Sequence, residues 1–217
     1  MLNLQKLSPR SFDWQLFTGV FFLVLIGMSA IYSVDLSRGS ELFFFKKQML
    51  ALGVGLLFLF VASTSQHTLW RYLAKWWYLF SLLLLVAVLI FGQSIRGTKG
   101  WFSVFGFSFQ PVEMAKIGLI LMIAYIISRF GRRFDKALFF FGTGIITLLL
   151  LVLTMLQPDL GSAVLLGVIW FGMVWAAGAR RLYLILLTAS VVFLAVMGWF
   201  FFLKDYQKYR LANFVNP

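Results

Sequence analysis

The segment FQPVEMAKIGLILMIAYIIS, residues 109–128, decides the fold class, because it is apolar over the length of a membrane span and yet begins with two charged side chains. A helix needs about 20 predominantly apolar residues to cross a bilayer. Glu113 and Lys116 are three residues apart, so they share one face of such a helix near its start. Apolar runs of similar length recur along the chain, which predicts an all-α, polytopic membrane helix bundle.

The composition leaves no room for a separate soluble domain. Of the 217 residues, 62% are hydrophobic and 12% are charged, and the mean hydropathy is +0.94. We therefore expect a single membrane domain over residues 1–217, in which residues 204–217 are the start of a truncated external loop. The seven expected spans cover residues 14–34, 48–64, 74–92, 110–128, 137–156, 159–178 and 182–203.

The basic residues lie between the apolar runs and do not gather in one tail, although the net charge is +12. This distribution is typical of loops anchored at a membrane surface, with membrane lipids as neighbours, and argues against a nucleic-acid partner. The short loops RFGRRFDK (129–136) and GARR (178–181) are strongly basic. By the positive-inside rule they predict that the N-terminus is inside and, after seven spans, that the C-terminus is outside.

The sequence gives little support for metal or cofactor chemistry. There are no cysteines, and His67 is the single histidine, so thiolate sites and histidine clusters are excluded. The chain has no Walker loop, HExxH or GxSxG motif. We expect no cofactor and no metal site, and leave a divalent cation at a substrate diphosphate open.

Two helices are predicted to begin with a glutamine–proline pair. Gln110-Pro111 precedes the fourth span and Gln157-Pro158 precedes the sixth. Proline favours the first helical position, which places Gln110 at the N-cap, Glu113 at the third helical position and Asp159 at the second position of its own helix. Carboxylates are stabilised there by the helix dipole and by free backbone N–H groups. Both starts belong to the outer side in this topology, so the charged groups share one depth.

These charges have a structural and a functional interpretation. In the first, Glu113 and Lys116 form a local ion pair and Asp159 only caps its helix. However, the helix dipole opposes a lysine close to a helix start, so capping does not explain Lys116. Ionisable side chains within membrane spans are costly and usually belong to a functional site. We therefore interpret the three side chains as parts of one site.

The segment RGTKGWFSVFGFSFQP, residues 96–111, precedes the fourth span. It combines Arg96 and Lys99 with Trp101, several phenylalanines and three glycines. Bases beside aromatic residues at the outer surface suit an anionic amphiphile such as a lipid phosphate. An ordinary hairpin at the membrane surface is the alternative that this segment alone favours.

Four motifs in this order resemble the SEDS family (shape, elongation, division and sporulation), the group of RodA and FtsW. GTKGWF (97–102) is similar to the family's G-A-x-R-W, and FQPVEMAK (109–116) to its F-Q-P-S-E-x-x-K. QPDLGSA (157–163) matches Q-P-D-L-G-[ST], and YQKYRLANFVNP (206–217) resembles the segment that opens the family's large external loop. Gly100 and Val112 depart from this pattern, because the family usually has arginine and serine there.

The resemblance implies a ten-span glycosyltransferase of the bacterial cytoplasmic membrane that polymerises lipid II into peptidoglycan glycan strands beside a class B penicillin-binding protein. It implies that Glu113 and Lys116 support catalysis. It also implies that the proposed catalytic aspartate follows Pro217, so that this chain is an incomplete, inactive fragment. We expect Glu113 to orient Lys116. We expect the substrate to be bound by Arg96, Lys99, Trp101, Gln110 and Asp159.

Two other functions remain open. A flippase or transporter of the lipid-linked precursor would also use interrupted helices and intramembrane charges. A non-enzymatic scaffold that recruits a transpeptidase is the second alternative. Between the two branches of the family, the short N-terminus favours the RodA type, which serves cell elongation, over the FtsW type, which serves division.

Overall fold

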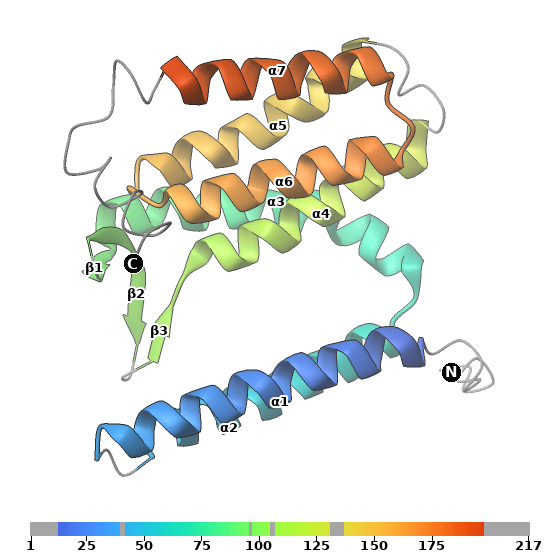
Figure 1. Cartoon of the computed structure of the whole chain (residues 1–217). Coiled ribbons are helices and arrows are strands. Elements are labelled where there is room, and N and C mark those ends of the chain that lie inside the picture. Colours follow the sequence, from blue (N-terminus) through green and yellow to red (C-terminus); the bar gives the residue numbers. More distant parts are fainter. Residues whose placement is uncertain (1–12, 40–41, 96, 105–106, 131–136, 198–217) are drawn as a thin grey trace. The chain divides into compact units, whose positions relative to one another are not determined.

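The structure, a computed structural model, describes residues 13–39, 42–95, 97–104, 107–130 and 137–197. Their order is two helices, a third helix, three short strands and four further helices (Figure 1). They form two compact units, residues 1–69 and 70–217, and each is described by itself. The expected single domain over residues 1–217 stays a prediction. Arg96 and the tail 198–217 lie outside the described residues.

The first unit is a pair of helices, α1 (Trp14–Ser37) and α2 (Phe43–Thr64). The carboxylate of Asp13 caps α1 by accepting a hydrogen bond from the Leu16 N–H at 3.0 Å. The residue before α2, Leu42, has no capping side chain. Instead, the buried Asp35 of α1 accepts a hydrogen bond from the Phe45 N–H at 2.8 Å. One carboxylate therefore ties the start of α2 to the end of α1.

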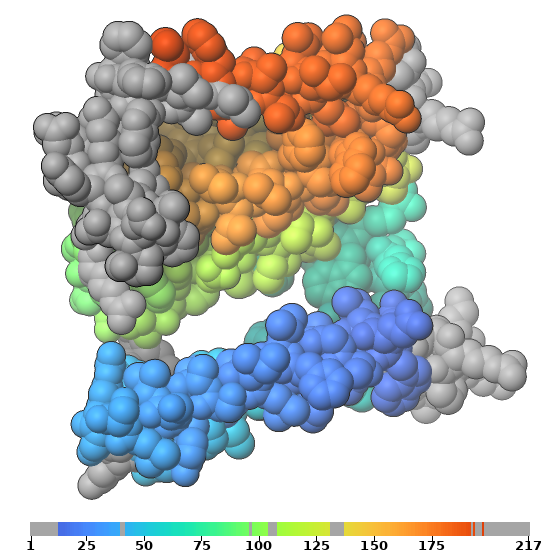
Figure 2. All heavy atoms as spheres, in the orientation of Figure 1, coloured from blue at the N-terminus to red at the C-terminus, as the bar shows by residue number. Residues whose placement is uncertain are grey.

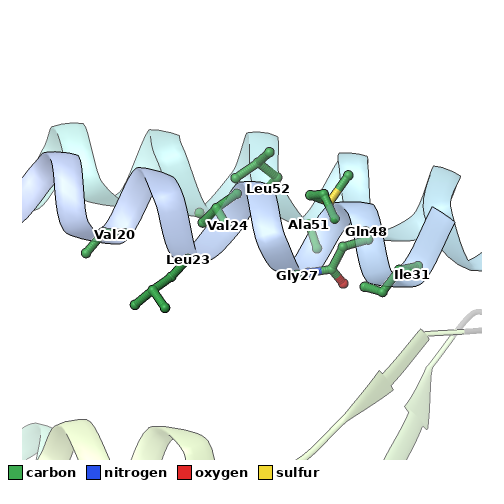
Figure 3. A pocket seen from close by; sticks show the side chains of 10 residues that line it. Val20, Leu23, Val24, Gly27, Ile31, Gln48, Ala51 and Leu52 are labelled. Atoms are coloured by element: carbon green, nitrogen blue, oxygen red, sulfur yellow. The ribbon is translucent and has the colours of Figure 1, made fainter. Parts of the chain in front are cut away.

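A groove of about 460 Å³ runs along this helix pair (Figure 3). Its lining is aliphatic or small except for the Gln48 amide and the Met28 thioether. It therefore lacks the cations that a phosphate ligand would need. The groove is not the candidate site.

The second unit contains most of α3 (His67–Phe91), with α4 (Pro111–Phe130), α5 (Ala137–Met155), α6 (Leu160–Ala176) and α7 (Arg181–Met197). Helix α6 packs against both α4 and α5, and their atoms meet closely in the space-filling view (Figure 2). Gly118 allows α3 and α4 to approach, because a Cβ atom there would lie 2.7 Å from the Ser81 hydroxyl oxygen. The core of this unit lies between these helices.

Polar side chains in this core bond across helices. The Tyr78 hydroxyl donates to the Ile146 carbonyl at 2.7 Å, and the Trp170 indole donates to the Thr143 hydroxyl at 3.1 Å. The buried hydroxyl groups of Thr147 and Thr154 donate to backbone carbonyls four residues earlier in α5. These four side chains thus find hydrogen-bond acceptors within the protein, as a membrane interior requires.

The membrane assignment agrees with helix length and composition. Among the described residues, five helices, α1 to α5, are long and apolar enough to cross a membrane. Helix α6 and the described part of α7 have 17 residues each, which is the lower end of spanning length. The predicted all-α, multi-pass membrane bundle is confirmed.

Three short strands connect α3 to α4: β1 (Gln93–Ile95), β2 (Thr98–Val104) and β3 (Phe107–Phe109). They pair antiparallel in the order β1-β2-β3, with Ser94 opposite Lys99 and Phe102 opposite Phe109. The segment before the fourth span is therefore built of hairpins. Strand β3 ends directly before Gln110, so this sheet leads into the start of α4.

Candidate functional site at the starts of α4 and α6

Helix α4 begins as the sequence predicts. Pro111 is its first residue, and the carbonyl of Gln110 accepts a hydrogen bond from the Glu113 N–H at 3.1 Å. Gln110 is therefore the N-cap, and Glu113 stands at the third helical position. Pro111 and Val112 are buried, which fixes this first turn in the protein interior.

Helix α6 begins differently from the prediction. It starts at Leu160, so Asp159 is the N-cap and not the second helical residue. The reason is that Gln157 and Pro158 belong to the turn that ends α5, where the Gln157 N–H donates to the Thr154 carbonyl at 3.1 Å. Aspartate is a favoured N-cap because its carboxylate accepts a free N–H of the first turn.

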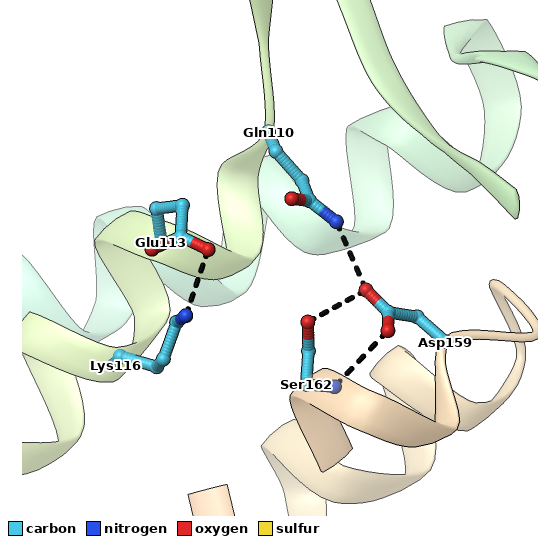
Figure 4. A network of polar contacts seen from close by, with 5 residues as sticks. All are labelled: Gln110, Glu113, Lys116, Asp159 and Ser162. Atoms are coloured by element: carbon cyan, nitrogen blue, oxygen red, sulfur yellow. Dashed lines mark hydrogen bonds and ion pairs between the residues drawn. The ribbon is translucent and has the colours of Figure 1, made fainter. Parts of the chain in front are cut away.

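The carboxylate of Asp159 joins the two helix starts (Figure 4). Its Oδ1 accepts from the Ser162 N–H at 3.0 Å, and its Oδ2 accepts from the Ser162 hydroxyl at 2.7 Å. Oδ2 also accepts from Nε2 of Gln110 at 2.9 Å. Two predicted residues that are 49 positions apart in sequence are thus in direct contact. Hydrogen bonds to an ionised group are stronger than neutral ones.

Glu113 and Lys116 form an ion pair one turn further along α4. Nζ of Lys116 donates to Oε1 of Glu113 at 2.7 Å. The Lys116 side chain is 19% exposed and that of Glu113 is 59% exposed. The protein therefore encloses the Lys116 side chain more than the Glu113 side chain, whose carboxylate faces outward. The local ion pair of the structural interpretation is present, and it stands beside the Asp159 network (Figure 4).

The β2 strand carries the two other predicted binding residues that are described. Lys99 is exposed and Trp101 is half-buried, on positions paired with Ser94 and Gln93 of β1. Among the described residues, neither forms a hydrogen bond or ion pair with the side chains at the helix starts. The structure therefore brings together Gln110 and Asp159, and separately Glu113 and Lys116. Arg96, the remaining candidate, lies outside the described residues.

Gln157 is the site residue that sequence reasoning did not select. Its side chain is fully buried, and its Nε2 donates to the Leu85 carbonyl of α3 at 3.5 Å. Its Oε1 has no hydrogen-bond partner among the described atoms, and a Cβ atom on Gly100 would lie 2.9 Å from it. The repeated Gln-Pro pair was the available signal. Gln157 thus packs the α5–α6 turn against α3 and β2.

In the described part of the chain, no three histidine, aspartate or glutamate side chains gather as a metal ion would require. The groups at the helix starts can instead bind an anion. Lys116 has three N–H donors, and one of them is used by Glu113. The site thus combines an ion pair, an aspartate that caps a helix, and a strand with an exposed lysine. These features define a multi-pass membrane protein with a polar site where two of its helices begin.

The chain belongs to the cell cycle protein family of FtsW, RodA and SpoVE, because residues 11–217 match the sequence profile of that family. The predicted membership of the SEDS family is thereby confirmed. The FtsW of Thiomicrospira cyclica, described as a probable peptidoglycan glycosyltransferase, is 31% identical over 227 residues that cover all of this chain and 57% of the relative. The Haemophilus influenzae protein of the same description is 33% identical over 98% of this chain and 55% of its own length.

Solved structures agree. One match is a chain from a peptidoglycan synthase complex, whose structure was described in terms of the coordination of polymerization and crosslinking. The TM-score is 0.73 and the identity 31%, over 95% of this chain and 60% of the matched chain. The Thermus thermophilus rod shape determining protein RodA matches with a TM-score of 0.68 and 30% identity, over 85% of this chain and 60% of its own. The chain thus spans little more than half the length of the relatives that it matches.

Proposed function

We propose that this chain supplies the part of a peptidoglycan glycosyltransferase that binds the lipid-linked diphosphate substrate, lipid II, at the outer face of the bacterial cytoplasmic membrane, with the N-terminus inside. Family membership supports the activity. The observation that carries the proposal is the Gln110–Asp159 hydrogen bond, which joins two helix starts beside the Glu113–Lys116 ion pair. A substrate that reaches the start of α4 would meet all four groups.

The reaction sets the chemical demands on this site. A sugar hydroxyl attacks the anomeric carbon of another lipid-linked sugar, a new C–O bond forms, and the bond from that carbon to the diphosphate oxygen breaks. A base must take the hydroxyl proton, and cations must stabilise the charge that develops on the diphosphate. We assign the second task to Lys116, with help from Lys99 and Arg96. The base is not assigned to a described residue.

Glu113 and Asp159 have positioning roles in this proposal. Glu113 holds the Lys116 ammonium by one N–H, which leaves two N–H donors for phosphate oxygens. Asp159 already accepts three hydrogen bonds from Ser162 and Gln110. It therefore fixes the distance between α4 and α6, while Gln110 and Trp101 line the approach to the sugar. A divalent ion at the diphosphate stays an expectation.

The test is polymerisation of purified lipid II by the longest natural form of the protein that contains these residues. Lys116→Ala should lower the rate at least about 100-fold, the usual effect of removing one group that stabilises transition-state charge. Glu113→Ala should lower the rate by a similar factor, because the Lys116 ammonium loses the carboxylate that positions it. Lys46→Ala, which removes an exposed lysine in the first unit, is the control and should polymerise normally. Glycan strands of normal length and rate from both site variants would remove the pair from the active site.

We infer that the partner is a class B penicillin-binding protein that crosslinks the product. The support is the structural match to a complex in which polymerization and crosslinking are coordinated. A role in elongation, of the RodA type, also stays a proposal, since the matched relatives include proteins called FtsW and one called RodA. Binding of the purified chain to the division or the elongation transpeptidase would separate these roles.

Precursor flipping is the rival function, because two polar helix starts within a bundle are also typical of transporters. Vesicles that hold the protein and labelled lipid II distinguish the two. Polymer without accelerated flipping supports the glycosyltransferase, and flipping without polymer supports the transporter. Binding to a transpeptidase with neither activity would leave the scaffold.

A further inference from the structure

At the other end of α4, two cations share one tyrosine. Nζ of Lys75, on α3, lies 5.3 Å from the centroid of the Tyr125 ring. Nη1 of Arg129, one turn after Tyr125 on α4, donates a hydrogen bond to the Tyr125 hydroxyl at 2.8 Å. We call these three residues the basic clamp. Two helices thus hold a lysine and an arginine around a single phenol ring.

The basic clamp has an uncompensated positive charge in the described part of the chain. The ion pair found there joins Glu113 to Lys116, and no described carboxylate lies within salt-bridge distance of Lys75 or Arg129. Two like charges held near one ring repel each other, and the repulsion grows in a medium of low dielectric constant. A bound anion would remove this cost.

The donors of the clamp are arranged to share such an anion. The Tyr125 oxygen accepts from Arg129, which leaves the Tyr125 O–H free to donate outward. Lys75 is an exposed residue whose ammonium lies over the ring face, and at least two of its three N–H donors remain for an anion when one points at the Tyr125 hydroxyl. The remaining guanidinium N–H groups of Arg129 suit a phosphate, because planar guanidinium binds phosphate oxygens in pairs.

The clamp lies in the last turns of α4, where aromatic side chains of α3 are exposed. Arg129 is the penultimate residue of α4, and Tyr125 is one turn before it. On α3, next to Lys75, the exposed side chains Tyr72 (72%) and Trp76 (62%) are of the kind that sits at the boundary between water and hydrocarbon. We propose that the basic clamp binds the phosphate of an anionic phospholipid, such as phosphatidylglycerol, in the leaflet at this end of α4. This site is separate from the proposed catalytic function.

The experiment measures lipid retained by the purified chain. Delipidated protein in detergent is titrated with phosphatidylglycerol or with zwitterionic phosphatidylcholine, and bound lipid is counted by native mass spectrometry. The double variant K75Q/R129Q should bind phosphatidylglycerol about 30-fold more weakly, since each base near an anionic surface contributes a factor of about five. The control R38Q/K46Q removes the same two residue types between the first and second spans, on the opposite side in the expected topology, and should bind like the unchanged chain.

Three further measurements make the result decisive. The single variants K75Q and R129Q should each lose about five-fold, which tests the clamp even if the double variant misfolds. Tyr125→Phe keeps the ring and removes the hydroxyl, so a loss there shows a shaped site and not a general charge effect. Equal binding by K75Q/R129Q and its control overturns the proposal. Displacement of the lipid by inorganic phosphate also overturns it, because the site would then bind free anions.

Discussion

The hydrogen bond between Gln110 and Asp159 can be tested by a double-mutant cycle on stability. Asp159→Asn keeps an oxygen for the Ser162 N–H, and asparagine caps a helix about as well as aspartate. The new amide nitrogen cannot accept from Nε2 of Gln110, which now donates at 2.9 Å. Since a hydrogen bond to a charged group contributes about 1.5–3 kcal/mol, we expect Asp159→Asn to cost about 1.5 kcal/mol.

Gln110→Ala should cost a similar amount, because it removes the other partner of the same bond. The double variant Gln110→Ala/Asp159→Asn should then cost little more than either change alone, with a coupling free energy of about 1–1.5 kcal/mol. Asp159→Ala also removes the N-cap of α6, which accepts the hydrogen bond from the Ser162 N–H. It should therefore cost about 1 kcal/mol more than Asp159→Asn. The free energy of unfolding in mixed detergent micelles is the quantity to measure.

Additive costs would refute this reasoning. If the two single changes sum to the double within about 0.5 kcal/mol, the side chains do not interact, and the two helix starts are not joined by this bond. Equal costs for Asp159→Asn and Asp159→Ala would show that the cap on α6 contributes nothing. In that case the network that supports the candidate site would lose its physical basis.

Two other changes test the packing around the site and the first unit. Gly100→Ala would bring Cβ to 2.9 Å from Oε1 of the buried Gln157, so it should lower the free energy of unfolding by about 1–3 kcal/mol. Adding Gln157→Ala should recover part of this loss. A double variant as unstable as Gly100→Ala alone would contradict the contact. Asp35→Ala removes the acceptor of the Phe45 N–H at 2.8 Å, so the start of α2 should fray and the Phe45 amide should exchange hydrogen faster. The control Asp13→Ala removes the cap of α1 instead and should leave exchange at Phe45 unchanged.

Two helices begin earlier than the apolar runs that predict them. The second span was expected from residue 48 and begins at Phe43, and the third was expected from residue 74 and begins at His67. Both additional stretches hold polar, basic or aromatic residues, and their backbone is already helical. Apolar runs report the hydrocarbon core, so they give a lower bound on helix length.

A site residue could be predicted correctly where local sequence determines its place in a helix, and not where tertiary packing does. Gln110 was predicted correctly as an N-cap, because proline is favoured at the first helical position and Pro111 occupies it. The same reasoning was wrong for Asp159, since the turn that ends α5 takes up Gln157 and Pro158. The burial of Gln157 against Gly100 could not be predicted, because no periodicity shows which glutamine turns inward.

The exposures of the ion pair bear on how the site would bind a diphosphate. If the pair served only to neutralise charge at a helix start, the dipole would favour Glu113 alone, and Lys116 would be a cost. The lysine is instead the more enclosed partner, 19% exposed against 59% for the glutamate, and it is held at 2.7 Å by a single N–H. A cation held against the protein by an outer carboxylate retains two donors for an anion. This arrangement favours pre-organised anion binding over a stabilising role.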